Sequence, residues 1–161
     1  MPESVWVAQS DPRVRPLLAD LAREYSSRYH RVLDDVHFEL REYPPERFAP
    51  PHGGLVLLLT EGIAVAGGAF QRCDEETAEL KRIWTHRAHR GLGLARRVVA
   101  ELEAEAGRRG YTRIFLTTGP NQPEARGLYL ATGYTPHFDV DAVPRTRLSF
   151  SKALPAAVGA R

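Results

Sequence analysis

The sequence has little of several features that define whole classes of protein. Its one cysteine, Cys73, excludes an internal disulfide framework and a zinc site built from cysteines, and it is typical of a reducing compartment. Neither sign of charge dominates, because 22 basic and 20 acidic residues leave a net charge of +2. A chain so close to neutral gives no indication of nucleic acid or an anionic membrane as its partner.

Long apolar runs are also missing. The longest, residues 55–59, is far too short to span a bilayer, and Met1-Pro2-Glu3-Ser4 does not resemble the start of a secretory signal. We therefore expect a soluble, cytoplasmic protein that contacts no membrane. The length favours one domain over residues 1–154, followed by a frayed tail over residues 155–161.

The spacing of apolar residues, glycines and prolines predicts the order of the elements. We expect helices over residues 11–29, 95–109 and 123–132, a short helix within 30–54, and strands over 55–60, 63–72, 77–85, 113–118, 134–138 and 146–154. Residues 77–118 read as strand, glycine turn, helix and strand, which makes one parallel β-α-β crossover. The sequence therefore predicts an α+β fold, with a mixed, mainly antiparallel sheet flanked by helices.

The most informative stretch is Arg90-Gly91-Leu92-Gly93-Leu94-Ala95, which leads directly into the strongly amphipathic helix expected over residues 95–109. Its two glycines let the backbone approach a ligand, and the unpaired amides at a helix start favour a phosphate. A P-loop is excluded, because no Gly-x-x-x-x-Gly-Lys-Ser/Thr occurs. A dinucleotide fingerprint is excluded as well, because Arg96 replaces its small third residue and the next strand ends in Thr117-Thr118 without a carboxylate.

This stretch resembles the pyrophosphate loop of the GCN5-related N-acetyltransferase (GNAT) family, whose pattern Arg/Gln-x-x-Gly-x-Gly/Ala is matched by Arg90-x-x-Gly93-x-Ala95. Two further motifs stand at the family's spacing. They are the fourth-strand motif Glu79-Leu80-Lys81-Arg82-Ile83-Trp84-Thr85 and the later motif Ala125-x-x-Leu128-Tyr129-x-x-x-Gly133-Tyr134. The resemblance covers roughly residues 55–135, and the run over 118–125 is similar to that of small bacterial single-domain members.

The resemblance implies acetyl-CoA as a co-substrate and no metal. Its pyrophosphate would lie against the backbone amides from Gly91 to Arg96, with Arg90 opening the loop. Its pantetheine arm would lie in a gap beside Ile83, Trp84 and Thr85, where the fourth strand splays from the fifth. Many family members have an asparagine contacting the pantetheine three residues before the motif alanine; here Gln122 stands at that position, with Asn121 beside it.

The resemblance also indicates two catalytic residues. An alkyl amine with a pKa near ~10 is only about a thousandth deprotonated at neutral pH, so a general base is useful, and Glu79 lies where the family often has one. The alternative is that Glu79 is a solvated strand-end carboxylate or a partner of Arg82. Tyr129 matches the family's general acid for the departing thiolate; the alternative is a tyrosine that only packs on its helix.

Other residues remain open or carry less weight. Tyr25, Tyr29, Phe38 and Tyr43 either line the acceptor pocket or belong to the core. We expect His86 and His89, next to the glycine turn, to be solvent-exposed rather than metal ligands, because no carboxylate accompanies them.

The leading hypothesis is an N-acetyltransferase that moves an acetyl group from acetyl-CoA to a primary amine by direct attack in a ternary complex. The alternative is a catalytically silent acyl-CoA-binding sensor or regulatory domain, which the presence of both Glu79 and Tyr129 disfavours. A nucleic-acid surface along the arginines of residues 82–97 is disfavoured by the near-neutral charge. The acceptor stays open between small-molecule and peptide amines. Pairing of family members through their C-terminal strands is compatible with a homodimer.

Overall fold

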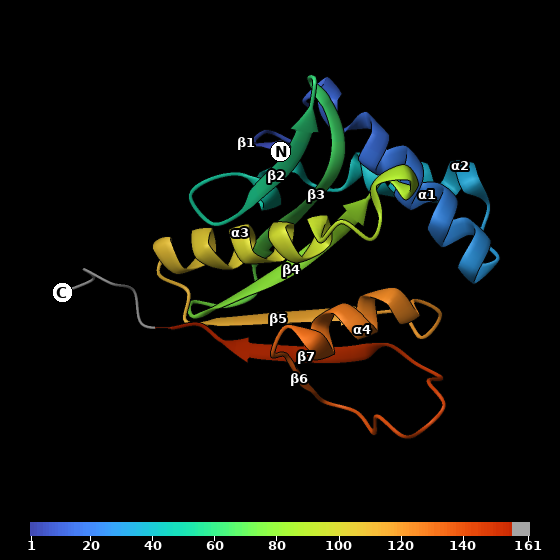
Figure 1. The fold of residues 1–161 in the computed structure, drawn as a ribbon, viewed down its shortest axis with the longest axis vertical. Coiled ribbons are helices and arrows are strands. Elements are labelled where there is room, and N and C mark those ends of the chain that lie inside the picture. Colours follow the sequence, from blue (N-terminus) through green and yellow to red (C-terminus); the bar gives the residue numbers. More distant parts are fainter. Residues whose placement is uncertain (156–161) are drawn as a thin grey trace.

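The computed structural model describes residues 1–155, and seven strands form one sheet in the order β1-β2-β3-β4-β5-β7-β6 (Figure 1). The strands are β1 (Glu3–Trp6), β2 (Gly54–Thr60), β3 (Ile63–Arg72), β4 (Thr77–Thr85), β5 (Arg113–Thr118), β6 (Thr135–Pro136) and β7 (Leu148–Ala153). The α-helices are α1 (Arg15–Tyr29), α2 (Leu33–Glu42), α3 (Leu94–Arg108) and α4 (Pro123–Ala131), with 3-10 turns at Pro12–Val14, Pro45–Phe48 and Arg87–His89.

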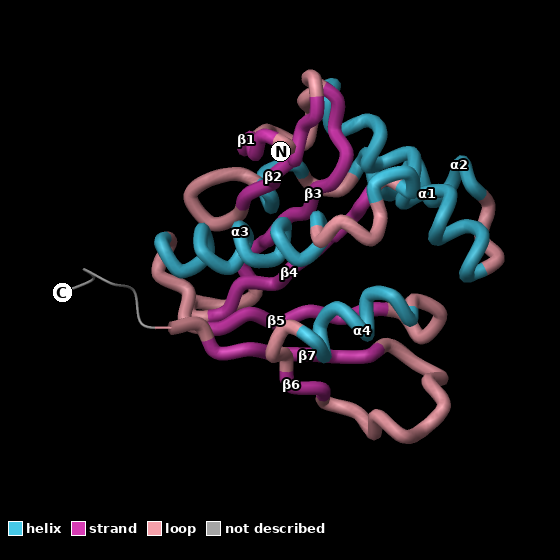
Figure 2. Tube along the Cα trace, in the orientation of Figure 1, coloured by secondary structure: helices cyan, strands magenta, loops and turns pink. Residues whose placement is uncertain are grey.

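The strand directions confirm the predicted fold class. Every pair of neighbouring strands is antiparallel except β4 and β5, which run parallel and are joined through α3 (Figure 2). The hairpin between β2 and β3 turns at Glu61 and Gly62, whose φ angles of 51° and 80° give the turn that matches the twist of paired strands. Of the predicted tail, residues 156–161 lie outside the described residues, and the single domain over residues 1–154 stays a prediction.

The two faces of the sheet carry two apolar clusters. Alternation along β2 divides its side chains, so that Val56 and Leu58 join the cluster beneath α3 and α4 while Leu55, Leu57 and Leu59 join the cluster beneath α1. In Figure 1, α3 and α4 accordingly lie in front of the sheet, while α1 and α2 gather at one end of it. The candidate site is lined by residues of β4 and β5 and of the helices α1, α3 and α4.

The N-terminal strand β1 is the one described strand that the sequence did not predict. It is a four-residue edge strand that pairs with β2 from Glu3–Leu59 to Trp6–Val56. A strand this short has almost no internal periodicity, and its pairing partner lies about fifty residues away in the chain. Tertiary pairing rather than local pattern therefore makes it a strand.

Candidate active site

The cleft of the protein opens where β4 and β5 separate. The two strands pair only from Thr77–Arg113 to Glu79–Phe115, although both continue beyond these residues. The backbone groups of residues 80–85 that face β5 consequently have no strand to pair with. A cleft of about 1010 Å³ fills the space between β4, β5, α1, α3 and α4. This divergence is the splay that the family resemblance implies.

The glycine turn forms one end of this cleft. Gly91 and Gly93 have φ angles of 80° and 77°, a conformation that side chains rarely allow, and a Cβ at either position would meet no atom within 4 Å. Gly93 is the N-cap of α3, and no side chain caps the helix. The first turn of α3 contains no acidic residue, although carboxylates are favoured there. The turn therefore leaves open amides and a positive helix end, which suit an anion.

Two buried polar atoms beside the turn support the same conclusion. Within the described residues, Thr85 Oγ1 and His89 Nδ1 are the buried side-chain oxygen and nitrogen atoms that make no hydrogen bond, and both residues line the cleft. Burying a polar atom without a partner is costly, so these two atoms are places where a ligand or water would supply the missing hydrogen bond. His86 and His89 are half-buried, so the expectation that both are solvent-exposed is wrong. His86 Nδ1 instead accepts a hydrogen bond from the Ala88 amide, and the two rings pack edge to face.

The structure brings most of the predicted cofactor-binding residues to the cleft wall. Those that line it are Ile83, Trp84, Thr85, Arg90, Gly91, Gly93, Leu94, Ala95, Arg96 and Gln122. Leu92 and Asn121 do not line it. The Leu92 side chain is 68% exposed, and the Asn121 amide donates to the Arg28 carbonyl instead.

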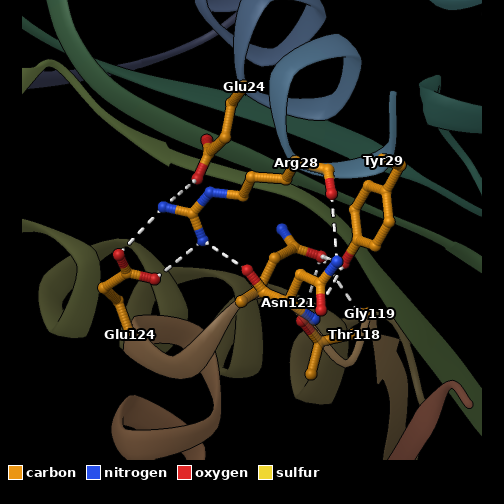
Figure 3. Close-up of polar contacts among 8 residues, drawn as sticks. Glu24, Arg28, Tyr29, Thr118, Gly119, Asn121 and Glu124 are labelled. Atoms are coloured by element: carbon orange, nitrogen blue, oxygen red, sulfur yellow. Dashed lines mark hydrogen bonds and ion pairs between the residues drawn. The ribbon is translucent and has the colours of Figure 1, made fainter. Parts of the chain in front are cut away.

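Gln122 organises the loop at the end of β5. Its Oε1 accepts hydrogen bonds from the Gly119 amide at 3.0 Å, from the Tyr29 hydroxyl at 3.2 Å and from Thr118 Oγ1 at 3.4 Å (Figure 3). Glycine at position 119 makes room for this arrangement, because a Cβ there would stand 1.7 Å from the Tyr29 hydroxyl oxygen and would displace the ring. The hydrogen bond between Tyr29 and Gln122 fixes the C-terminal end of α1 against the loop that leads into α4.

Arg28 also connects the C-terminal end of α1 to the start of α4. Its guanidinium donates two hydrogen bonds of 2.9 Å to the Glu124 carboxylate and one of 2.9 Å to the Asn121 carbonyl, and it lies 3.2 Å from Glu24 (Figure 3). These hydrogen bonds hold the pKa of Glu124 at about 2, well below its usual value. Glu124 is largely exposed, so this ion pair contributes less than about 1 kcal/mol of stability. Its role is positional: it connects α1 to α4 across one end of the cleft.

Tyr129 presents an unpaired hydroxyl to the cleft. Its ring packs against Tyr134 and Phe150 with centroid distances of 5.4 and 5.5 Å, and the residue is 4% exposed. Its hydroxyl makes no hydrogen bond with any described residue, yet Tyr129 lines the cleft. Burial raises the pKa of the Tyr129 phenol, with a smaller contribution from the nearby Tyr25, so the proton is held at neutral pH.

Glu79 stands at the point where β4 and β5 part. Its Oε1 accepts a hydrogen bond from Gln71 Nε2 at 3.2 Å, and its Oε2 lies 3.6 Å from Lys81 Nζ. Gln71 is held in turn by the Tyr43 hydroxyl, which donates to its Oε1 at 2.5 Å. Glu79 lines the cleft with its side chain 18% exposed. Among the described residues its cationic neighbour is therefore Lys81, and not Arg82 as the alternative interpretation had it.

The sequence predicts four aromatic residues either to line the acceptor pocket or to belong to the core, and three of them line the cleft. Tyr25, Tyr29 and Tyr43 lie on its wall, where the N-terminal helices cover the sheet. Phe38 is 56% exposed and is not part of the wall. The pKa of Tyr25 is raised by burial, and the nearby cation of Arg82 opposes that rise.

Arg82 is a lining residue that the sequence analysis considered only as a partner of Glu79 and as part of an arginine-rich surface. It lies at a β-bulge in β4 with a φ of 60°, and it is 8% exposed. A signal for it existed: the alternating residues Ala78, Leu80 and Trp84 are apolar and buried, so an arginine in that series stands where an apolar side chain is expected. We return to it below.

The described residues limit the other kinds of site. The described residues contain no group of three or more histidine, cysteine, aspartate or glutamate side chains placed to hold a metal ion. None of the helices in residues 1–155 is long and apolar enough to cross a bilayer. Cys73 is exposed in the turn between β3 and β4, away from the cleft wall.

The fold and the cleft define a class of protein, and comparison with known proteins identifies it. The sequence model described as Acetyltransferase (GNAT) family matches residues 15–134, and the chain belongs to this family. A curated relative, the uncharacterized N-acetyltransferase YsnE of Bacillus subtilis (strain 168), is 36% identical over 77 residues. That match covers 46% of this chain and 51% of the relative, so the chain spans about half the length of the curated relative it matches.

Solved structures agree over nearly the whole chain. A proposed acyl-CoA N-acyltransferase from Klebsiella pneumoniae subsp. pneumoniae MGH 78578 is 25% identical, with a TM-score of 0.74 over 96% of this chain and 98% of its own. A GNAT-family acetyltransferase from Staphylococcus aureus Mu50 has the same TM-score of 0.74 over 95% of this chain and 100% of its own. At 13% identity the second likeness shows the fold alone.

Proposed function

We propose that the chain is an N-acetyltransferase that transfers an acetyl group from acetyl-CoA to a primary amine by direct attack in a ternary complex. One observation carries the proposal. A single cleft contains the glycine turn with its uncapped helix start, the two diverging strands β4 and β5, and the side chains of Tyr129 and Glu79 on its walls. Family membership supports the same reading.

The residues of the cleft are suited to hold CoA. The amides of residues 91–96 and the positive end of α3 would bind the pyrophosphate, and Arg90 and Arg96 beside them add positive charge. On the side of β4 that faces β5, the free backbone groups of Ile83, Trp84 and Thr85 would pair with the pantetheine amides in the manner of an added strand. Thr85 Oγ1 and His89 Nδ1 would gain the hydrogen bonds that they lack.

The chemical step needs two proton transfers. The amine nitrogen attacks the thioester carbonyl carbon, which forms the new carbon–nitrogen bond. The carbon–sulfur bond then breaks, so that the acetyl group stays on the amine and CoA leaves as the thiolate. Glu79 would take the proton that the amine loses, directly or through water, and Tyr129 would give a proton to the departing thiolate. A backbone amide of β4 in the splay would stabilise the negative charge on the carbonyl oxygen. The proton gained by Glu79 returns to Tyr129 through solvent.

Bisubstrate kinetics test this proposal. The full chain is assayed for CoA release while acetyl-CoA and a panel of small and peptide amines are varied, with a Cys73→Ser variant used so that the exposed protein thiol adds no background. We expect amine-dependent release with intersecting reciprocal plots, which a ternary complex produces. Parallel plots would contradict direct attack. Tight CoA binding without turnover on any amine would overturn the enzyme in favour of the sensor.

A further inference from the structure

Arg82 is a buried cation without an acidic partner. Four glutamates line the cleft, and each lies beside another cation: Glu24 and Glu124 beside Arg28, Glu39 beside Arg31, and Glu79 beside Lys81. Arg82 forms no ion pair with any described residue, and the groups that favour its charged form electrostatically are the phenols of Tyr25 and Tyr43. Burial lowers the pKa of Arg82 to about 10, which still leaves it charged at neutral pH.

The neighbours of Arg82 hold its guanidinium in one orientation. One terminal nitrogen donates to Gln9 Oε1 at 3.0 Å and the other to the Leu40 carbonyl at 2.7 Å. The guanidinium carbon lies 5.3 Å from the ring centroid of Tyr43 and 5.0 Å from that of Phe48, so aromatic rings support the group. An arginine has five N–H donors, and these contacts use two of them. The remaining N–H donors of Arg82 are available to a ligand, because Arg82 lines the cleft.

The backbone of Arg82 carries a further cost. Its φ of 60° lies in the left-handed region, which a residue with a side chain adopts only where the surrounding structure imposes it. Strain, burial and an uncompensated charge thus coincide at one residue of the cleft wall. A structural role accounts for the two donors that Gln9 and Leu40 use, but it gives no reason for a buried positive charge, which a neutral donor would avoid.

The position of Arg82 relative to the proposed chemistry follows from the cleft wall. Arg82, Tyr25 and Tyr129 all line the same cleft. Arg82 also directly precedes Ile83 in β4, where the pantetheine arm would lie. A small molecule whose amine reaches the thioester would therefore have Arg82 on the wall of the space that it occupies.

We propose that the acceptor is an amino carboxylate, whose carboxylate pairs with Arg82 while its amine attacks the thioester. This inference rests on the proposed function. The planar guanidinium fork matches a carboxylate in shape as well as charge. A bound carboxylate would supply the negative charge that this buried cation lacks among the described residues. A simple alkyl amine would leave Arg82 uncompensated in the filled cleft.

Matched acceptors test the proposal without altering the protein. CoA release is compared for amino acids, their carboxamides and the corresponding amines without a carboxylate, using α-amino and longer-chain amino acids. We expect kcat/KM to be about 10- to 100-fold higher for the carboxylates, because a hydrogen-bonded charge pair is lost in the other two. The carboxamides have the less basic amines, so they would react faster if only amine deprotonation mattered. Equal or faster turnover of the carboxamides would overturn the inference and leave the proposed function standing.

Variants add a second readout. Arg82→Gln should abolish the preference for carboxylates, and Arg82→Lys should keep part of it, since lysine retains the charge but not the fork. Arg31→Gln is the matched control, because Arg31 also lines the cleft but already pairs with Glu39 at 2.9 Å; it should keep the full preference. A preference that survives in Arg82→Gln would refute the assignment.

Calorimetry separates this inference from the proposed function. If no amine is acetylated, the proposed function fails, and binding of an amino acid to the full chain without turnover becomes the test. Carboxylate binding that is at least about tenfold weaker to Arg82→Gln would still support the pairing, whereas equal binding to both, or none to the wild type, would overturn it.

Discussion

Replacing Tyr129 with phenylalanine should separate catalysis from stability. The Tyr129 ring contributes the packing against Tyr134 and Phe150, and phenylalanine keeps that packing. The hydroxyl has no hydrogen-bond partner among the described residues, so its removal leaves no group unsatisfied and should change the free energy of unfolding by less than about 1 kcal/mol. If the hydroxyl gives its proton to the thiolate, kcat should fall by about 100-fold.

Tyr134→Phe is the matched control for this variant. The Tyr134 hydroxyl is also buried, but it donates to Glu103 Oε2 at 2.7 Å and does not line the cleft. Its loss should cost about 1–3 kcal/mol, which lowers Tm by about 3–9 °C, while kcat stays unchanged. The pair is measured by CoA release and by thermal unfolding. A Tyr129→Phe enzyme with the wild-type kcat would refute the general-acid role, and a Tyr134→Phe enzyme with a comparable loss of kcat would show that general perturbation, not proton donation, is responsible.

Three further outcomes are expected. Glu79→Gln should lower kcat by about 10- to 100-fold near pH 7 and recover as rising pH deprotonates the amine, which a pH–rate profile checks; a pH-independent loss contradicts the base role. Gly93→Ala should weaken acetyl-CoA binding about tenfold in calorimetry, because its φ is 77°, whereas Gly107→Ala in α3, with no positive φ, should leave binding unchanged. The pKa values of Tyr129 and Tyr134 are raised by burial, so the folded state keeps protons that the unfolded state loses above pH ~10, and stability should fall there. Urea unfolding of the double phenylalanine variant should show a shallower fall than the wild type, and an equal fall would be evidence against these shifts.

Much of the fold could be predicted because its elements have strong local patterns. The bounds predicted for the strands at residues 77–85 and 113–118 coincide with β4 and β5. The long helix begins at Leu94, one residue before the predicted start, and Gly110 follows its end with a φ of 96°. All three elements have clear periodicity, and glycines also mark the ends of α3 and the end of β5, so local sequence determines them. The edge strand β1 is too short to show a period.

The candidate site divides in the same way. The glycine turn is a local motif of six residues, so the sequence alone could predict an anion-binding turn there. The acceptor side could not be predicted, because Arg82 meets Gln9 and Leu40 across 73 and 42 residues of chain. The bulge that buries Arg82 arises from the pairing of β3 with β4, and no residue pattern within β4 specifies it. Contacts of this kind follow from the assembled sheet rather than from spacing.

The most direct test of the acetyl-transfer function is to count products. The full chain is incubated with acetyl-CoA and each amine of the panel; free CoA is measured, and the amine is analysed by mass spectrometry. The cleft predicts that CoA and an N-acetylated amine form in equal amounts, and that both disappear when the amine is left out. CoA formation that does not depend on any amine, or a chain that binds acetyl-CoA and acetylates nothing, would contradict it.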